Sequence, residues 1–131
     1  TYVLTGDNSS IEGSVTAAGT TRTWIHGTVG KDVTAVGPVS THYNSVVTGD
    51  IVAAATSTTE IYGTVNGRLT AGGVVLIDSS GRVAGDTSAG TTTGTTTVRG
   101  RISGDLRVRG MAYVDNGATV TMAFGLQPVK E

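Results

Sequence analysis

The chain has 131 residues, with 20 Gly, 2 Pro and no Cys, and its 9 basic and 10 acidic residues leave a formal net charge of −1. The lack of Cys excludes a disulfide framework and thiolate metal sites, and the near-neutral charge excludes a global field that recruits nucleic acid. No run of about 18 apolar residues offers a membrane-spanning helix. The 24 Thr and 18 Val are β-branched and favour strands, so we expect an all-β chain with a thin core.

The first predicted strands recur at a fixed spacing, which is the signature of a repeat architecture. Residues 23–29 (TWIHGTV) return as residues 59–65 (TEIYGTV) and again as residues 97–102 (TVRGRI). The first step is 36 residues and the second is 37. The extra residue falls in the Thr-rich stretch 91–97, which we interpret as a loop insertion.

A second series alternates with the first. Residues 11–15 (IEGSV) return as residues 47–51 (VTGDI), 83–87 (VAGDT) and 120–124 (VTMAF). Both series contain a Gly between two β-branched residues, so we interpret them as two forms of one unit. The 36-residue repeat then holds two rungs of about 18 residues. The repeats cover residues 11–46, 47–82 and 83–119, with a partial repeat 120–131, in one domain that spans residues 1–131.

Apolar residues alternate with polar ones within each rung. Ile61, Val65 and Leu69 share one face, and polar residues lie between them. This period marks strands with one buried face. Short strands, Gly corners and the fixed period predict a single-stranded right-handed β-helix (a β-solenoid), with aliphatic residues inside and Thr ladders outside. A β-sandwich is the alternative, but it gives no reason for a 36-residue recurrence. A left-handed hexapeptide helix would require apolar residues every six positions rather than every four.

Four segments resemble the bactofilins, the polymer-forming cytoskeletal proteins of bacteria. They are residues 47–51 (VTGDI), 61–71 (IYGTVNGRLTA), 74–77 (VVLI) and 83–86 (VAGD), and their order and spacing are similar to the family pattern over residues 5–124. The resemblance implies a right-handed β-helix that assembles end to end, without nucleotide, into non-polar filaments. Such filaments join head to head and tail to tail and act as scaffolds, often along the inner membrane. The apolar membrane-binding segment of the family is not evident in residues 1–8.

The residues that carry chemistry are few and scattered, so we predict no catalytic residue, no metal site, no cofactor and no enzymatic activity. The two histidines are His26, whose counterparts in the other repeats are a Tyr and an Arg, and His42 in a connection. Asp50 and Asp86 occupy the same repeat position two rungs apart, about 10 Å by strand spacing, which is wide for a carboxylate pair. We expect each to accept a hydrogen bond from a corner N–H or to pair with an Arg.

The sequence places four arginines close together. Arg99, Arg101, Arg107 and Arg109 alternate with apolar residues and Gly, so we expect their side chains to point outward together. Such a face could meet a membrane surface with anionic lipid, at about 1 kcal/mol per Arg, or cell-wall-associated proteins. The alternative is a solvated face balanced by neighbouring Asp residues.

The ends of a solenoid expose core residues and unpaired backbone groups, which pair with other chains unless they are capped. Val3 and Leu4 lie in the first rung, and Met122 and Phe124 lie in the last. We predict that these four residues form a polymerisation interface, although Phe124 could simply close the core. The predicted function is a structural protein that forms nucleotide-independent filaments with itself, as a cytoplasmic scaffold. A secreted or phage Thr-rich fibre or adhesin domain, outside the cell, is the alternative. A leader segment is expected to be absent or removed.

Overall fold

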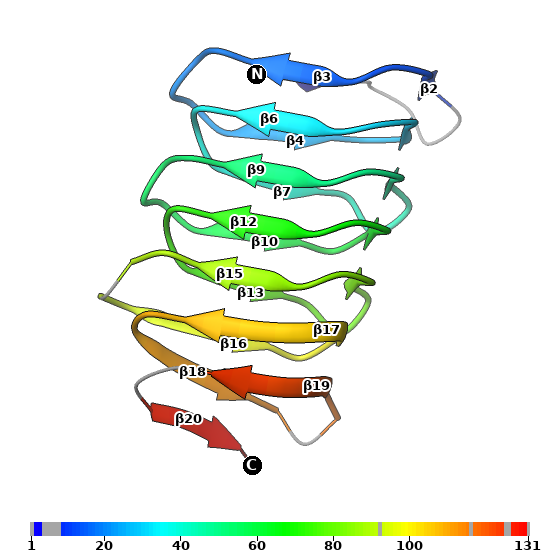
Figure 1. Ribbon diagram of the computed structural model, residues 1–131. Helices are drawn as coiled ribbons and strands as arrows, with labels where there is room; N and C mark the ends of the chain where they lie inside the picture. The colour runs from blue at the N-terminus through cyan, green and yellow to red at the C-terminus, as the bar shows by residue number, and fades with distance from the viewer. Residues whose placement is uncertain (1, 4–8, 92, 116, 125–126, 131) are drawn as a thin grey trace.

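The computed structural model is a stack of parallel β-coils, a β-solenoid, and it confirms the predicted fold class. It describes residues 2–3, 9–91, 93–115, 117–124 and 127–130, and within these ranges the side chains of residues 9–91, 93–115 and 117–120. The described residues contain strands and turns and no helix. Figure 1 shows the coils winding in a right-handed sense from the N-terminal end to the C-terminal end.

The strands form three faces of the rod. Face A is an 8-stranded sheet, and faces B and C share a 12-stranded sheet because β17 (Arg101–Val108) runs through both. Face A contains β1 (Tyr2–Val3), β4 (Thr23–Ile25), β7 (Val39–Thr41), β10 (Thr59–Ile61), β13 (Val75–Ile77), β16 (Thr95–Val98), β18 (Met111–Val114) and β20 (Gln127–Lys130). Face B contains β2 (Ser10–Ile11), β5 (Thr28–Val29), β8 (Val46–Val47), β11 (Thr64–Val65) and β14 (Arg82–Val83). Face C contains β3 (Val15–Ala17), β6 (Val33–Ala35), β9 (Ile51–Ala53), β12 (Leu69–Ala71) and β15 (Thr87–Ala89), and β19 (Thr119–Phe124) follows β17.

The register differs between the faces. On faces B and C, paired residues are eighteen positions apart as far as β15, as in Thr28↔Val46 and Val46↔Thr64. On face A the offset alternates between sixteen and twenty from β4 to β13, as in Trp24↔Ser40 and Ser40↔Glu60. It is 22 between β1 and β4, 21 between β13 and β16, and sixteen at both later steps. One 16-residue step and one 20-residue step add up to 36, so this alternation produces the repeat.

The alternation comes from the connections on either side of face A. Between faces C and A, residues 18–22 make a long connection and residues 36–38 a short one. Between faces A and B, residues 26–27 make a short connection and residues 42–45 a long one. Short and long connections compensate each other, so each strand of face A shifts by two residues while faces B and C keep their register.

The two Gly-centred series are therefore not two forms of one unit, as the sequence suggested. Val29 of the first series stacks on Val47 of the second, eighteen residues on. The segment from Ile25 to Val29 turns the corner between faces A and B, and the segment from Val47 to Ile51 turns the corner between faces B and C. The similar pattern reflects a similar need for an inward aliphatic residue on each side of a corner.

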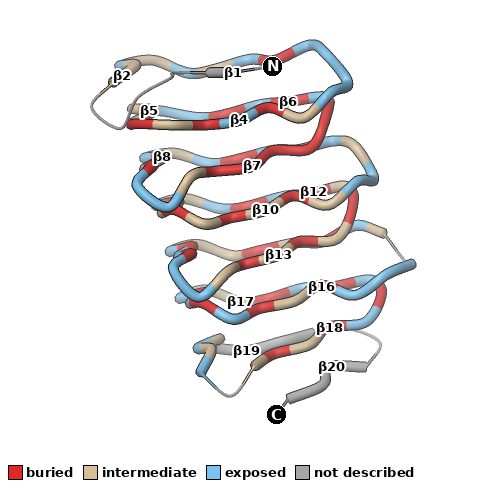
Figure 2. The backbone as a smooth tube through the Cα atoms, turned by 180° about the vertical axis from the view of Figure 1, so that it is seen from behind, coloured by how far each residue is buried: buried red, intermediate tan, exposed pale blue. Residues whose placement is uncertain are grey.

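Aliphatic columns fill the interior, and Figure 2 shows buried residues in every coil from β4 to β18. Each column consists of residues at the same position of successive coils. The face B column is the most regular, with Val29, Val47, Val65, Val83 and Ile102. Each such side chain stabilises the fold by about 1.5–3 kcal/mol through burial.

Threonine is not confined to the outside, contrary to the sequence-based expectation. Thr34 and Thr70 are exposed, but Thr23, Thr59 and Thr96 are completely buried on face A. A buried hydroxyl is tolerated where it has a hydrogen-bond partner, and the hydroxyl oxygen of Thr96 accepts the backbone N–H of Val75 at 3.2 Å. Some Thr residues thus serve as internal acceptors for strand starts.

Thr23 and Thr87 are exceptions, because neither hydroxyl oxygen has a hydrogen-bond partner among the described residues. Thr87 stands in a face C column with Val33, Ile51, Leu69 and Leu106, and it is completely buried. An unpaired buried hydroxyl costs free energy that an isosteric apolar group would not.

We therefore predict that Thr87→Val raises the free energy of unfolding by about 1 kcal/mol. Thr96→Val is the matched control, because the same change there removes the acceptor of the Val75 N–H and should lower stability by a similar amount. Urea denaturation followed by circular dichroism measures both. A loss of stability in Thr87→Val equal to that in Thr96→Val would contradict this view of the core.

Candidate functional site

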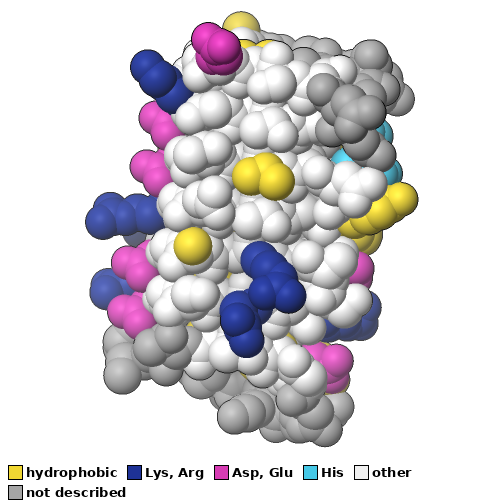
Figure 3. All heavy atoms as spheres, turned by 90° about the vertical axis from the view of Figure 1, so that its right-hand side faces the viewer, with side chains coloured by type: hydrophobic (Ala, Val, Ile, Leu, Met, Phe, Trp, Pro, Cys, Tyr) yellow, Lys and Arg dark blue, Asp and Glu magenta, His cyan; other side chains and the backbone are white. Residues whose placement is uncertain are grey.

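A polar column follows the corner between faces B and C. It consists of Ser14, Asp32, Asp50, Arg68, Asp86 and Asp105 in successive coils. Figure 3 shows acidic side chains, with basic ones among them, along one edge of the rod. The carboxylates are bound to the backbone of the following coil: Oδ1 of Asp32 accepts the N–H of Asp50 at 2.8 Å, and Oδ1 of Asp50 accepts the N–H of Arg68 at 2.8 Å.

The Gly that precedes the column position is required by this arrangement. A Cβ atom added to Gly67 would collide with Oδ1 of Asp50 and with the backbone of Gly49. Gly104 stands in the same relation to Asp86. The recurring Gly-Asp pair is therefore a packing unit, in which each Asp occupies the space that the Gly of the next coil leaves open.

The expectation that Asp50 and Asp86 accept corner N–H groups is confirmed. Oδ1 of Asp86 accepts the N–H of Asp105 at 2.9 Å. Arg68 separates the two acids in the column, so they do not form a carboxylate pair. Within the described ranges, no group of three or more His, Asp or Glu side chains is arranged to hold a metal ion.

This role predicts how Asp50 variants behave. Asp50→Ala should lower the free energy of unfolding by about 1 kcal/mol, because the N–H of Arg68 loses its acceptor. Asp50→Asn keeps an oxygen acceptor and removes repulsion from Asp32 one coil away, so its stability should equal or exceed that of the wild type. Urea denaturation compares the three proteins. If Asp50→Asn lowers the free energy of unfolding as much as Asp50→Ala does, the column does not depend on a side-chain oxygen that accepts the backbone N–H of the next coil.

The structure separates the four predicted arginines. All four are exposed, but they lie around two different hollows rather than on one common face. Arg99 and Arg101 border a hollow of about 170 Å³ together with Arg82, which the sequence analysis missed and which pairs directly with Arg101 across β14 and β17. Arg82 stands nineteen residues before Arg101. The 18-residue length of a coil could therefore have indicated from the sequence, to within one residue, that the two arginines lie on neighbouring coils.

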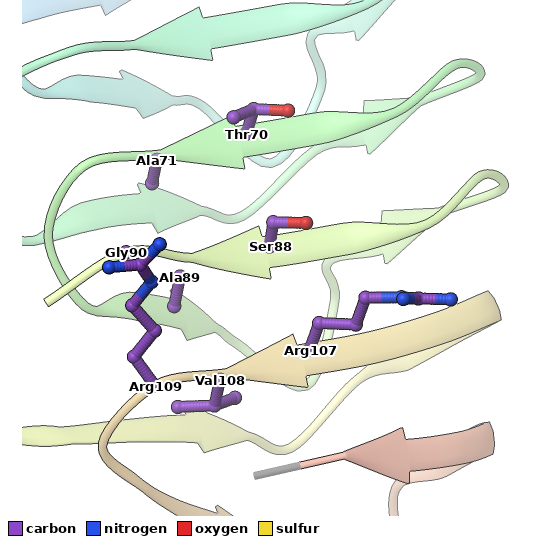
Figure 4. A pocket seen from close by; sticks show the side chains of 8 residues that line it. All are labelled: Thr70, Ala71, Ser88, Ala89, Gly90, Arg107, Val108 and Arg109. Atoms are coloured by element: carbon purple, nitrogen blue, oxygen red, sulfur yellow. The ribbon is translucent and has the colours of Figure 1, made fainter. Parts of the chain in front are cut away.

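Arg107 and Arg109 border a second hollow, of about 440 Å³, on face C. Figure 4 shows the side chain of Arg109 reaching the coil of β15 beside Gly90, whereas Arg107 extends along the outside of β17. Small side chains of β12 and β15 form most of the wall, among them Ala71 and Ser88. The two arginine pairs can therefore contact different partners.

Three of the four predicted polymerisation residues lie in strands near the two ends of the rod. Val3 belongs to β1 on face A, and Met122 and Phe124 belong to β19, where they pair with Asp105 and Arg107. The side chains of these three residues are outside the described residues, and so is the whole of Leu4. The interface that they would form stays a prediction.

A pocket of about 300 Å³ at the corner between faces A and B gathers most of the ring side chains. Its lining is Trp24, His26, Thr41, His42, Tyr43, Glu60 and Tyr62. The counterparts of His26 in later repeats, Tyr62 and Arg99, do not reveal which residue lies beside it in the fold. The 16-residue step of face A brings His42 next to His26, and the 20-residue step brings Tyr62 next to His42.

Ring contacts hold this pocket together. The rings of His26 and His42 stack with centroids 4.6 Å apart and an interplanar angle of 24°. The ring of His42 also contacts that of Tyr43, at 4.2 Å and 37°. Tyr43 is 61% exposed, so this contact orients a side chain that the core does not support.

A chain of polar contacts behind the pocket ends at Glu60, which is part of the pocket lining. A guanidinium nitrogen of Arg22 donates to the hydroxyl of Ser40 at 2.6 Å, and this hydroxyl donates to Oε1 of Glu60 at 3.1 Å. Arg22 also lies 3.7 Å from the same carboxylate oxygen and 5.9 Å from the ring centre of Trp24. The carboxylate is thus fixed in position, and its charge is compensated by a neighbouring cation.

Comparison of the chain with protein-family models, curated proteins and solved structures found no match. In the part of the chain that the structure describes, no helix has the length and apolar character needed to cross a membrane.

Proposed function

We propose that this chain is a structural protein that assembles end to end into nucleotide-independent filaments and serves as a cytoplasmic, cytoskeletal scaffold. The uninterrupted ladder of parallel strands supports this proposal most directly. Its outer strands β3 and β19 each pair, among the described strands, with a single neighbour. Open strand edges add strands from other chains. The resemblance of residues 47–86 to bactofilins favours a non-polar filament, joined head to head and tail to tail.

The aliphatic columns at both ends also favour stacking. Val15 in the first coil and Val120 in the last are partly buried against the core, whereas their pairing partners Val33 and Ile102 are completely buried. A further coil on either end would cover the remaining apolar surface at about 25 cal/mol per Å². Stacking a second molecule on either end would therefore bury apolar surface that the single molecule leaves exposed.

The strand edge of β3 gives a specific test. Val15 donates its N–H to Asp32 at 2.8 Å, and Ala17 accepts the N–H of Val36 at 3.0 Å, so both residues bond toward β6. Alternate residues of a parallel strand bond to opposite sides, which directs the N–H of Thr16 to the outer edge. Proline at this position removes only that donor and is tolerated in an edge strand.

We predict that wild-type protein forms concentration-dependent assemblies and that Thr16→Pro, which blocks only the end at β3, reduces them to dimers joined at the opposite end. Thr16→Val, which keeps the N–H, should assemble like the wild type. Sedimentation velocity and negative-stain microscopy in nucleotide-free buffer measure the outcome, and Phe124→Arg tests the other end. A wild type that stays monomeric at high concentration, or filaments of Thr16→Pro equal to those of the wild type, would refute end-to-end assembly at this edge.

The scaffold would contact a membrane surface or cell-wall-associated proteins through its arginines, and Arg82 and Arg101 are the strongest pair for this role. Like charges directly opposite each other on neighbouring strands repel, and these two arginines are such a pair. An anionic partner would relieve that repulsion as well as bind. A secreted or phage fibre, outside the cell, would use the same rod and remains the alternative.

We therefore expect wild-type protein to co-sediment with phosphatidylserine vesicles at low salt. Arg82→Glu with Arg101→Glu should lower the binding constant at least about thirtyfold, since two arginines contribute about 2 kcal/mol. Arg107→Glu with Arg109→Glu is the matched control for total charge and should cost less. Equal losses in the two double variants would show a response to net charge rather than to this pair.

A further inference from the structure

Rings are concentrated at one place on this molecule. The structure describes the side chains of four Trp and Tyr residues, and three of them, Trp24, Tyr43 and Tyr62, line the pocket at the corner between faces A and B. Both histidines of the chain line it too. Trp24 and Tyr43 are 39% and 61% exposed, so these rings present apolar faces to solvent rather than filling the core.

We propose that this pocket binds a neutral saccharide, as a one- or two-ring unit of a glycan. A sugar ring has an apolar C–H face and a rim of hydroxyls, and it needs flat apolar surfaces beside fixed hydrogen-bonding groups. The rings of Trp24, Tyr43 and Tyr62 supply the surfaces, and Glu60 supplies a carboxylate acceptor. Amphipathic rings that combine an apolar body with a polar tip suit such a ligand.

The resident charges favour a neutral ligand over an organic cation. A cage of aromatic rings with a carboxylate could bind a quaternary ammonium group through cation–π contacts. Here the guanidinium of Arg22 already lies 5.9 Å from the ring centre of Trp24 and 3.7 Å from Oε1 of Glu60. The guanidinium of Arg22 therefore already supplies the positive charge that a cationic ligand would bring to such a cage.

The same contacts disfavour an anion. The guanidinium of Arg22, beside the pocket, is committed to Ser40 and Glu60 by the contacts at 2.6 Å and 3.7 Å. An incoming phosphate would face the Glu60 carboxylate, which the pocket wall includes. A ligand without net charge avoids both the repulsion and the need for a counter-ion.

The pocket is also ordered before any ligand arrives. The stack from His26 through His42 to Tyr43 holds the most exposed ring, and the bond from the Ser40 hydroxyl holds the carboxylate. Groups fixed in advance lose little conformational entropy on binding. The volume of about 300 Å³ lies at the lower end of the range for small-molecule pockets, about 300–1,000 Å³, which fits a unit of one or two sugar rings.

Saccharide binding does not depend on filament formation. The pocket lies on the side of the rod, on strands β4, β7 and β10 and the connections that follow them, and it does not include the end strands β3 and β19. Thr16→Pro should leave saccharide binding unchanged, so the two proposals can fail separately.

The chain contains a single Trp, and it lies in the pocket, so its fluorescence reports on binding directly. The probes are cellobiose, maltose and diacetylchitobiose, with tetramethylammonium chloride and inorganic phosphate as charged alternatives. Ligand-detected NMR on the same samples covers binding that leaves the emission unchanged. We expect at least one saccharide to bind and neither ion to compete with it.

The variants Tyr43→Ala and Glu60→Gln should each weaken saccharide binding about tenfold, through loss of a stacking surface and of a charged acceptor respectively. Tyr113→Ala is the matched control, since Tyr113 lies on β18 outside the pocket lining, and it should bind like the wild type. Circular dichroism verifies the fold of each variant. The proposal is overturned if no saccharide binds, if Tyr43→Ala binds as tightly as the wild type, or if tetramethylammonium binds where the saccharides do not.

Discussion

The parallel ladder that joins each coil to the next is the interaction on which the rest of this structure depends. Neighbouring coils are separated by one strand spacing, about 4.8 Å, so the main neighbours of a side chain are the residues at its own position one coil away. Val47 stacks between Val29 and Val65, and the interior is a continuous aliphatic column because these residues match. The polar column of Asp32 and Asp50 obeys the same rule, with hydrogen bonds in place of apolar contacts.

This rule also separates residues that support the rod from residues that remain for function. The Asp carboxylates at the corner between faces B and C are bound to backbone N–H groups of the next coil, and the Gly beside them makes room for them. Two features are not occupied by contacts between coils of the same molecule: the outer edges of strands β3 and β19, and the ring pocket that contains Trp24 and Glu60. The first supports assembly along the rod axis, and the second supports recognition on its side.

The sequence predicted the fold because identical positions must match along every column. The 36-residue period, the inward aliphatic residues and the corner Asp acceptors could all be recognised from the printed residues. The alternating 16- and 20-residue register of face A could not, because only its sum appears as a repeat, and the separate steps depend on connection lengths. That gap explains why the pairing of His26 with His42 was missed. The buried Thr96 was missed because its hydrogen-bond partner, the Val75 N–H, lies 21 residues away in the sequence and is brought beside it only by the folded coils.

Cysteine cross-linking tests this register most directly, and the chain contains no Cys that would interfere. Thr34 and Val52 are paired one coil apart on face C, and Glu60 and Leu76 are paired across sixteen residues on face A. Cys substitutions at either pair should form a disulfide, because a strand spacing lies within the Cα separation that a disulfide bridges, about 4.4–6.8 Å. Cys at positions 34 and 70, two coils apart, should stay reduced. A disulfide between positions 34 and 70, or reduced thiols in both one-coil pairs, would contradict the stacked coils described above.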